Sequence, residues 1–74
     1  MGRLAGFRYS DVVRKLREAG FDFERHAAGS HEVWRHSETR RKTTVVRHPG
    51  DIPEGTLRAI IREAGLTLDE FLKL

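Results

Sequence analysis

The sequence contains no cysteine, two prolines, and one each of tryptophan, tyrosine and methionine. The lack of cysteine excludes disulfide bonds and thiolate metal sites, and it suits a reducing compartment such as the cytoplasm. No apolar run approaches the ~20 residues that a membrane-spanning helix needs. The segment Met1–Gly6 has one basic residue but no apolar core long enough for a signal peptide. We therefore expect a cytoplasmic localisation and no membrane segment.

The chain is short for a protein that acts alone. Its 74 residues predict a single domain over residues 1–74. A domain of this size buries only about 60% of the surface of the unfolded chain. That size leaves little room for a deep pocket or a large cofactor, and many such domains are completed by a partner. The sequence is 38% hydrophobic and 34% charged, which indicates a small core under a strongly polar surface.

Hydrophobic spacing divides the chain into two helical blocks around a strand-rich middle. Ser10 is a suitable N-cap for the first helix, and Thr67 with Glu70 forms a capping box for the last. The predicted elements are a helix from Ser10 that Gly20 ends, strands over Phe21–Glu24, His31–His36 and Lys42–Val46, a helix with Pro53 in its first turn that Gly65 ends, and a short helix through Leu72. The order predicts an α+β fold, α-β-β-β-α, with a three-stranded antiparallel sheet, both helices on one face and a short C-terminal helix.

Histidine and positive charge gather in the middle of the chain. All four histidines lie between residues 26 and 48, at His26, His31, His36 and His48. Residues 25–48 contain six Lys or Arg against two acids, whereas residues 1–24 sum to +1 and residues 49–74 to −2. A basic segment attracts a polyanion, and a histidine within it can transfer a proton near neutral pH. RNA cleavage requires both properties, a site that binds the phosphate and a group that moves a proton. A base can remove the proton of the 2′-hydroxyl, which then attacks the adjacent phosphate, so that no metal or other cofactor is needed.

His31 is the candidate catalytic residue, as a general acid or base. Gly29 has no side chain, so a phosphate can come close to the backbone there, and Ser30 adds a hydroxyl. The main-chain amides of Gly29 and Ser30 could bind a phosphate oxygen. Three basic residues on neighbouring strands are candidate phosphate contacts, namely Arg25, Lys42 and Arg47. The alternative is that His31 is only a polar residue at the start of a strand, because the sequence does not reveal a tuned pKa.

Three further features allow more than one interpretation. A metal site is not expected, because no short ligand motif such as H-E-x-x-H occurs and no acid is placed to complete one. Trp34 either packs in the core or stacks on a base. The run Arg40–Lys42 forms either a phosphate clamp or a solvated turn.

Four segments together resemble the HicA toxins of prokaryotic toxin–antitoxin pairs, which are small mRNA interferases with a double-stranded-RNA-binding-domain-like fold. The segments are Leu16–Phe21, Gly29–His31, Thr43–His48 and Ile52–Leu66, and the resemblance extends from Ser10 to Leu74. It implies that His31 is catalytic and that messenger RNA is cleaved without a metal. It also implies a HicB-like antitoxin that covers the active face.

The chain departs from the family pattern at two positions. Glu32 stands where many members have a second histidine, and Val46 stands where many have proline. The first departure leaves the identity of a second acid–base group open. Glu32 would also repel phosphate unless its side chain points away from His31, as the alternation along a strand allows.

Three hypotheses from different classes follow. The first is a metal-independent endoribonuclease toxin with His31 as general acid or base. The second is an RNA-binding module without catalysis, since a fold does not fix an activity. The third is a regulatory subunit whose basic face contacts only a protein partner, and strongly salt-dependent RNA binding would argue against it.

Overall fold

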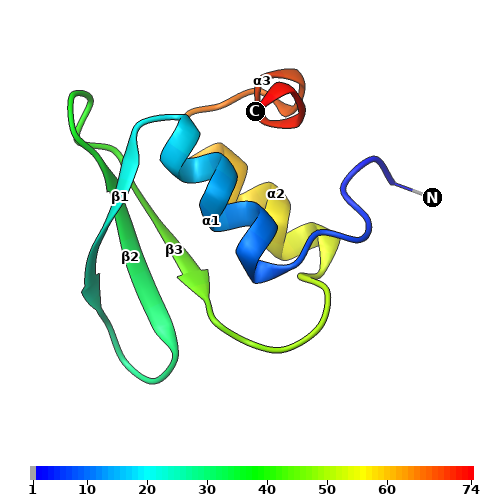
Figure 1. The fold of residues 1–74 in the computed structure, drawn as a ribbon, viewed down its shortest axis with the longest axis horizontal. Coiled ribbons are helices and arrows are strands. Elements are labelled where there is room, and N and C mark those ends of the chain that lie inside the picture. Colours follow the sequence, from blue (N-terminus) through cyan, green and yellow to red (C-terminus); the bar gives the residue numbers. More distant parts are fainter. Residues whose placement is uncertain (1) are drawn as a thin grey trace.

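The computed structural model describes residues 2–74 and contains three helices and one sheet (Figure 1). In chain order the elements are α1 (Tyr9–Glu18), β1 (Phe21–His26), β2 (His31–His36), β3 (Lys42–Val46), α2 (Glu54–Glu63) and α3 (Leu68–Lys73). The strands are antiparallel in the order β1-β2-β3. The predicted α+β fold with its terminal helix is confirmed. No helix among residues 2–74 has both the length and the apolar character to cross a membrane.

The core lies between the sheet and the helices α1 and α2, which lie on the same side of it (Figure 1). Its fully or almost fully buried residues include Val12 and Leu16 of α1, Leu57 and Ile60 of α2, and Trp34 and Val45 of the sheet. The helical residues recur at the three- and four-residue spacing that predicts an amphipathic helix. Trp34 is 1% exposed, so the core interpretation is confirmed and no face of its ring is left for a base.

The second face of the sheet carries no helix, and we call it the open face. Neighbouring residues of a strand point to opposite faces, so the open face holds the residues that alternate with Trp34 and Thr43, both of which are buried. These are His31, Val33 and Arg35 of β2 and Lys42, Thr44 and Val46 of β3. His31 pairs with Val46 across the two strands, which places it at one end of this face.

The strand β1 differs from its prediction at the C-terminal end. The prediction ends at Glu24, whereas β1 continues to His26. Between Phe23 and Arg25 the pairing with β2 shifts, so Glu24 is an extra residue on the β1 side. Such a bulge interrupts the alternation of side chains between the faces. The alternating pattern in the sequence therefore ends at the bulge, and a prediction based on it misses the last two residues of β1.

Two predicted helix starts are wrong, that of α1 by two residues and that of α2 by one. The helix α1 begins at Tyr9, with Arg8 at the N-cap, so Ser10 lies inside the helix. The carboxylate of Asp11, the third residue of the helix, accepts a hydrogen bond from the Arg8 main-chain N–H at 2.9 Å, as the acidic member of a capping box does. Pro53 is the N-cap of α2 rather than a residue of its first turn, because its ψ of 143° keeps it extended.

The other predicted ends of the helices are confirmed. Gly20 and Gly65 follow α1 and α2 with φ of 101° and 76°, a conformation that costs glycine little and other residues much more. The capping box of α3 is formed in full. Thr67 Oγ1 accepts from the Glu70 N–H at 3.1 Å, and the Glu70 carboxylate accepts from the Thr67 N–H at 2.8 Å.

Candidate functional site

The predicted Gly-Ser-His motif forms the tight connection between β1 and β2. The His31 N–H donates to the Ala28 carbonyl at 3.3 Å, and the Ala27 N–H donates to the His31 carbonyl at 2.9 Å. Gly29, between them, has a φ of 63°, in the left-handed region that glycine adopts most easily. The loop thus delivers His31 to the first position of β2, as the sequence predicts.

The His31 ring is exposed and is fixed through one of its nitrogens. Nδ1 lies 2.8 Å from the Ala28 carbonyl oxygen. A carbonyl only accepts hydrogen bonds, so Nδ1 carries the proton in this contact. The neutral ring then presents its lone pair on Nε2, because the two nitrogens of a neutral imidazole have opposite roles. His31 therefore has the geometry of a base whose free nitrogen is accessible from solvent.

Arg47 is the predicted basic residue that lies beside this loop. Its main-chain N–H donates to the Ser30 carbonyl at 3.1 Å, so it is tied to the residue next to His31. The guanidinium lies over the ring of Tyr9, 5.3 Å from the ring centre, in a cation–π contact. No acid of residues 2–74 lies within ion-pair distance of it. The guanidinium thus lies over Tyr9 of α1, and the Arg47 main chain is the part placed beside the Gly-Ser-His motif.

Glu32 points away from His31 and is buried on the helix side of the sheet. Its side chain is 3% exposed, and Oε1 accepts a hydrogen bond from Tyr9 Oη at 2.6 Å and another from Trp34 Nε1 at 3.2 Å. The carboxylate is therefore satisfied inside the protein. The expectation that strand alternation separates Glu32 from a phosphate at His31 is confirmed.

Tyr9 is a partner of this network that the sequence did not reveal. Desolvation by burial, followed by the hydrogen bond and the charge of Glu32, raises the pKa of Tyr9 above 10.0. The phenol thus stays protonated as a donor over the whole neutral range. No local pattern could identify the pair, because 23 residues separate Tyr9 from Glu32.

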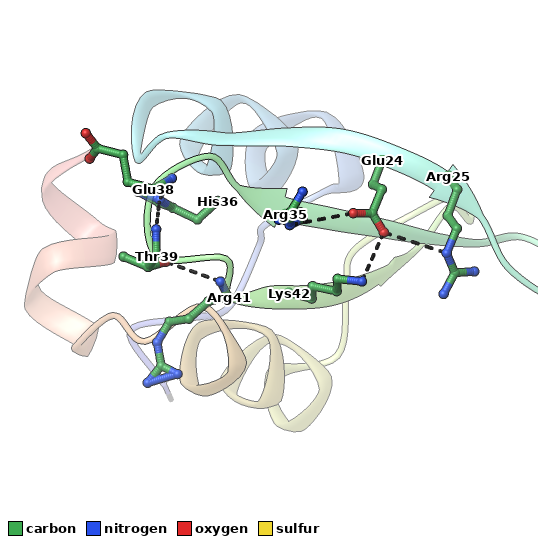
Figure 2. Close-up of polar contacts among 8 residues, drawn as sticks. All are labelled: Glu24, Arg25, Arg35, His36, Glu38, Thr39, Arg41 and Lys42. Atoms are coloured by element: carbon green, nitrogen blue, oxygen red, sulfur yellow. Dashed lines mark hydrogen bonds and ion pairs between the residues drawn. The ribbon is translucent and has the colours of Figure 1, made fainter.

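Two predicted phosphate contacts, Arg25 and Lys42, lie elsewhere on the open face, around the carboxylate of Glu24 (Figure 2). Lys42 Nζ is 3.3 Å and Arg25 Nε 3.7 Å from Glu24 Oε2. A residue not predicted for the site, Arg35, completes the group, with Nε 3.8 Å from Glu24 Oε1. The sequence showed each charge but not this convergence, which depends on the bulge at Glu24 and on the register of three strands.

The basic run Arg40–Lys42 does not form one clamp. The Arg41 side chain lies against Gly65, where an added methyl group would collide with it. Lys42 instead reaches Glu24. The connection itself is held by His36, whose Nδ1 accepts the N–H groups of Glu38 at 3.0 Å and Thr39 at 3.1 Å (Figure 2).

The surroundings of His31 are open rather than enclosed. One hollow in the surface of residues 2–74 lies along α2 and the start of α3. Another lies along β1 and β2, and His31 lines neither of the two. Within the same residues no three His, Asp or Glu side chains gather to hold a metal ion. An open surface suits an extended polymer better than a small molecule, which proteins usually enclose.

Comparison with known protein families identifies a match that covers most of the fold. A family model described as "HicA toxin of bacterial toxin-antitoxin" matches residues 9–66. The matched range covers more than half of the chain and includes α1, the whole sheet, α2 and His31. No curated protein matches the chain.

Proposed function

The chain belongs to the HicA family of toxins from bacterial toxin–antitoxin pairs, and from this premise we propose that it is an endoribonuclease that cleaves messenger RNA. In this proposal residues 1–74 act as one toxin domain in the cytoplasm, need no metal or other cofactor, and are inhibited by a HicB-like antitoxin. The observation that carries the proposal is the geometry of His31, with Nδ1 bound to a carbonyl and Nε2 accessible.

His31 acts as the general base on the RNA 2′-hydroxyl. Nε2 accepts the hydroxyl proton, the 2′-oxygen forms a bond to the adjacent phosphorus, and the bond from phosphorus to the 5′-oxygen breaks. The departing 5′-oxygen takes a proton from water. The products are a 2′,3′-cyclic phosphate and a 5′-hydroxyl. The Ala28 carbonyl keeps Nδ1 protonated and the ring oriented, so that Nε2 carries the lone pair.

Gly29, Ser30 and Arg47 hold the phosphate that is cleaved. Negative charge builds up on this phosphate in the transition state, and donors fixed beside it lower the barrier. The Gly29 and Ser30 amides donate to no main-chain acceptor of residues 2–74, and the Arg47 main chain is bound to the same loop. The free amides next to His31, with the Arg47 main chain bound to the same loop, support the proposal.

The first test is cleavage of single-stranded RNA in excess EDTA by the wild type and the His31→Ala variant. We expect His31→Ala to lower the rate by about 100-fold or more, the usual contribution of a general base. His48→Ala is the matched control, because His48 is partly exposed and its Nδ1 also lies close to a main-chain carbonyl oxygen, at 2.7 Å. Its rate should stay within a few-fold of the wild type, and circular dichroism would verify that all three proteins fold.

Other outcomes select the other hypotheses. Equal losses in both histidine variants would show that His31 has no special role. A folded wild type that binds RNA without cutting it would indicate a non-catalytic RNA-binding module. Antitoxin binding without measurable RNA affinity would indicate a regulatory subunit.

A further inference from the structure

The open face contains a cluster of three cations around one carboxylate, formed by Arg25, Arg35 and Lys42 around Glu24 (Figure 2). One carboxylate oxygen of Glu24 faces Arg35, and the other is shared by Lys42 and Arg25. We call these four residues the Glu24 cluster. Its three positive charges exceed its one negative charge, and they still exceed the two when Asp22, the cross-strand neighbour of Arg35 on the same face, is included. The cluster therefore remains an attractive site for an anion.

The contacts within the Glu24 cluster are loose. Its three N–O distances are 3.3, 3.7 and 3.8 Å, longer than the 2.7–2.9 Å or so of a strong charge-assisted hydrogen bond. The basic side chains are 37–59% exposed, whereas that of Glu24 is 25% exposed. Exposed ion pairs of this kind contribute little to stability, because water already solvates both charges. Glu24 can therefore be displaced by another anion at low cost.

The cluster is nevertheless ordered over the sheet. Val33 lies on the open face, away from the core, and yet it is only 6% exposed. Its cross-strand partners are Arg25 and Thr44, and Arg35 lies two residues along the same strand. The aliphatic stems of long basic residues cover apolar surface in this way while their charged ends stay in water. The charged groups of Arg25 and Arg35 are therefore held in defined positions above Val33 before any anion binds.

The cluster also lies in line with His31. Both His31 and Arg35 belong to β2 and point to the open face, four residues apart, which corresponds to about 13 Å along a strand. A nucleic-acid strand bound at His31 and running along β2 would bring a further backbone phosphate to the cluster. A phosphodiester has one negative charge and two unesterified oxygens, and thus resembles the carboxylate already there.

From these observations we infer that the Glu24 cluster is a second phosphate-binding site of the open face, and that the Glu24 carboxylate occupies it until RNA displaces it. The inference rests on the proposed function, since RNA is the polyanion that the proposal supplies. Glu24 thereby acts as an internal competitor of the RNA backbone. It weakens RNA binding and keeps the three basic side chains gathered in the free protein.

The test measures the affinity of a single-stranded oligouridylate in a His31→Ala background, where the RNA stays intact. Adding Glu24→Gln should raise the affinity about tenfold at low salt, the effect of removing one nearby charge worth roughly 1.4 kcal/mol. The slope of log K against log salt should change little, because RNA displaces Glu24 in the parent protein as well and the number of phosphate contacts stays the same. The matched control is Glu38→Gln, which makes the same charge change on the β2–β3 connection, away from the cluster (Figure 2).

A second variant separates a local site from general charge. Adding Arg35→Met to Glu24→Gln should cancel most of the gain if the phosphate binds within the cluster. Equal gains from Glu24→Gln and Glu38→Gln would overturn the inference. So would a gain in affinity for polyglutamate as large as that for RNA, since the site would then suit an acidic protein segment.

Failure of this inference is distinguishable from failure of the proposed function. If the wild type cleaves RNA and Glu24→Gln brings no gain in affinity, only the second phosphate site is wrong. If Glu24→Gln brings the gain and the wild type cleaves nothing, the phosphate site stands and the nuclease proposal fails.

Discussion

At the scale of single residues, the neighbours His31 and Glu32 show how one strand serves two purposes. His31 is exposed at the end of the open face, and Glu32 is 3% exposed beneath it. The buried carboxylate is tolerated because Tyr9 and Trp34 both donate to it, and a buried carboxylate without donors is strongly destabilising. The departure from the family pattern at Glu32 thus concerns the support of β2 rather than the open face.

Replacing Tyr9 by phenylalanine tests this support. Tyr9→Phe removes the 2.6 Å hydrogen bond to Glu32 and keeps the ring beneath Arg47. We expect the free energy of unfolding at neutral pH to fall by about 1.5–2 kcal/mol, since a bond to a buried charged acceptor is lost. Urea denaturation measures the change. Phe7→Leu, at another partly buried aromatic next to the core, serves as a packing control, and an unchanged midpoint for Tyr9→Phe would contradict this account.

Titration of Tyr9 gives an independent check. The pKa of Tyr9 is raised above 10.0 by burial and by Glu32, so the folded state favours the protonated phenol. The corresponding stability is fully present below the unfolded pKa of 10.0 and is lost as the pH rises through the folded pKa. Tyr9 is the only tyrosine, so tyrosinate absorbance reports it alone. The folded protein should titrate at higher pH than the urea-unfolded chain, and coincident curves would contradict the buried contact.

At the scale of elements, α3 depends on contacts with α1. With six residues it is far below the length at which a helix is stable alone. Lys15 of α1 is 6% exposed, and its Nζ donates to the main-chain oxygens of Phe71, at 3.3 Å, and Leu74. The same ammonium lies 5.3 Å from the centre of the Phe71 ring and 5.8 Å from that of Phe7. A cation at the C-terminal end of a helix satisfies its last carbonyls and its dipole.

Lys15→Met tests how α3 is held. Methionine keeps most of the apolar stem but leaves the carbonyls of the last turn without their donor. We expect the free energy of unfolding to fall by about 1–2 kcal/mol. Relative to the wild type, amide hydrogen exchange should become faster in α3 more than in the sheet. Lys73→Met, at an exposed position of α3, makes the same charge change and should have little effect. Equal amide exchange rates of α3 in the Lys15→Met and Lys73→Met variants would show that apolar packing alone holds α3 in place.

At the scale of the whole molecule, the sheet separates two chemically different sides. The helices and nearly all buried apolar residues lie on one side (Figure 1), and the other side presents His31 and the Glu24 cluster. The net charge is only +3, so the RNA binding that we propose depends on the arrangement of charge on the open face rather than on its total. A HicB-like antitoxin that covers this face would exclude RNA, which is our proposal for inhibition.

This arrangement predicts a moderate salt dependence of RNA binding. The two proposed phosphate contacts on a single strand correspond to a slope of about −1.4 in log K against log salt. Fluorescence anisotropy of labelled RNA with the His31→Ala protein measures this slope. A slope near zero would contradict an RNA-binding face and favour the regulatory-subunit hypothesis.

The sequence alone determined the order of the elements, the bounds of β2 and β3, the glycine ends of α1 and α2, and the capping box of α3. Each depends on residues within a few positions of one another, so the local pattern carries the information. It also singled out the segment Gly29–His31, whose loop has the predicted form. Its catalytic role stays a prediction.

Only the tertiary structure decided which charges meet. The burial of Glu32 depends on Tyr9, 23 residues away. The Glu24 cluster requires a bulge in β1 and the register of three strands. These contacts join distant parts of the chain, and their partners are fixed by packing and strand pairing, which no local pattern in the sequence specifies.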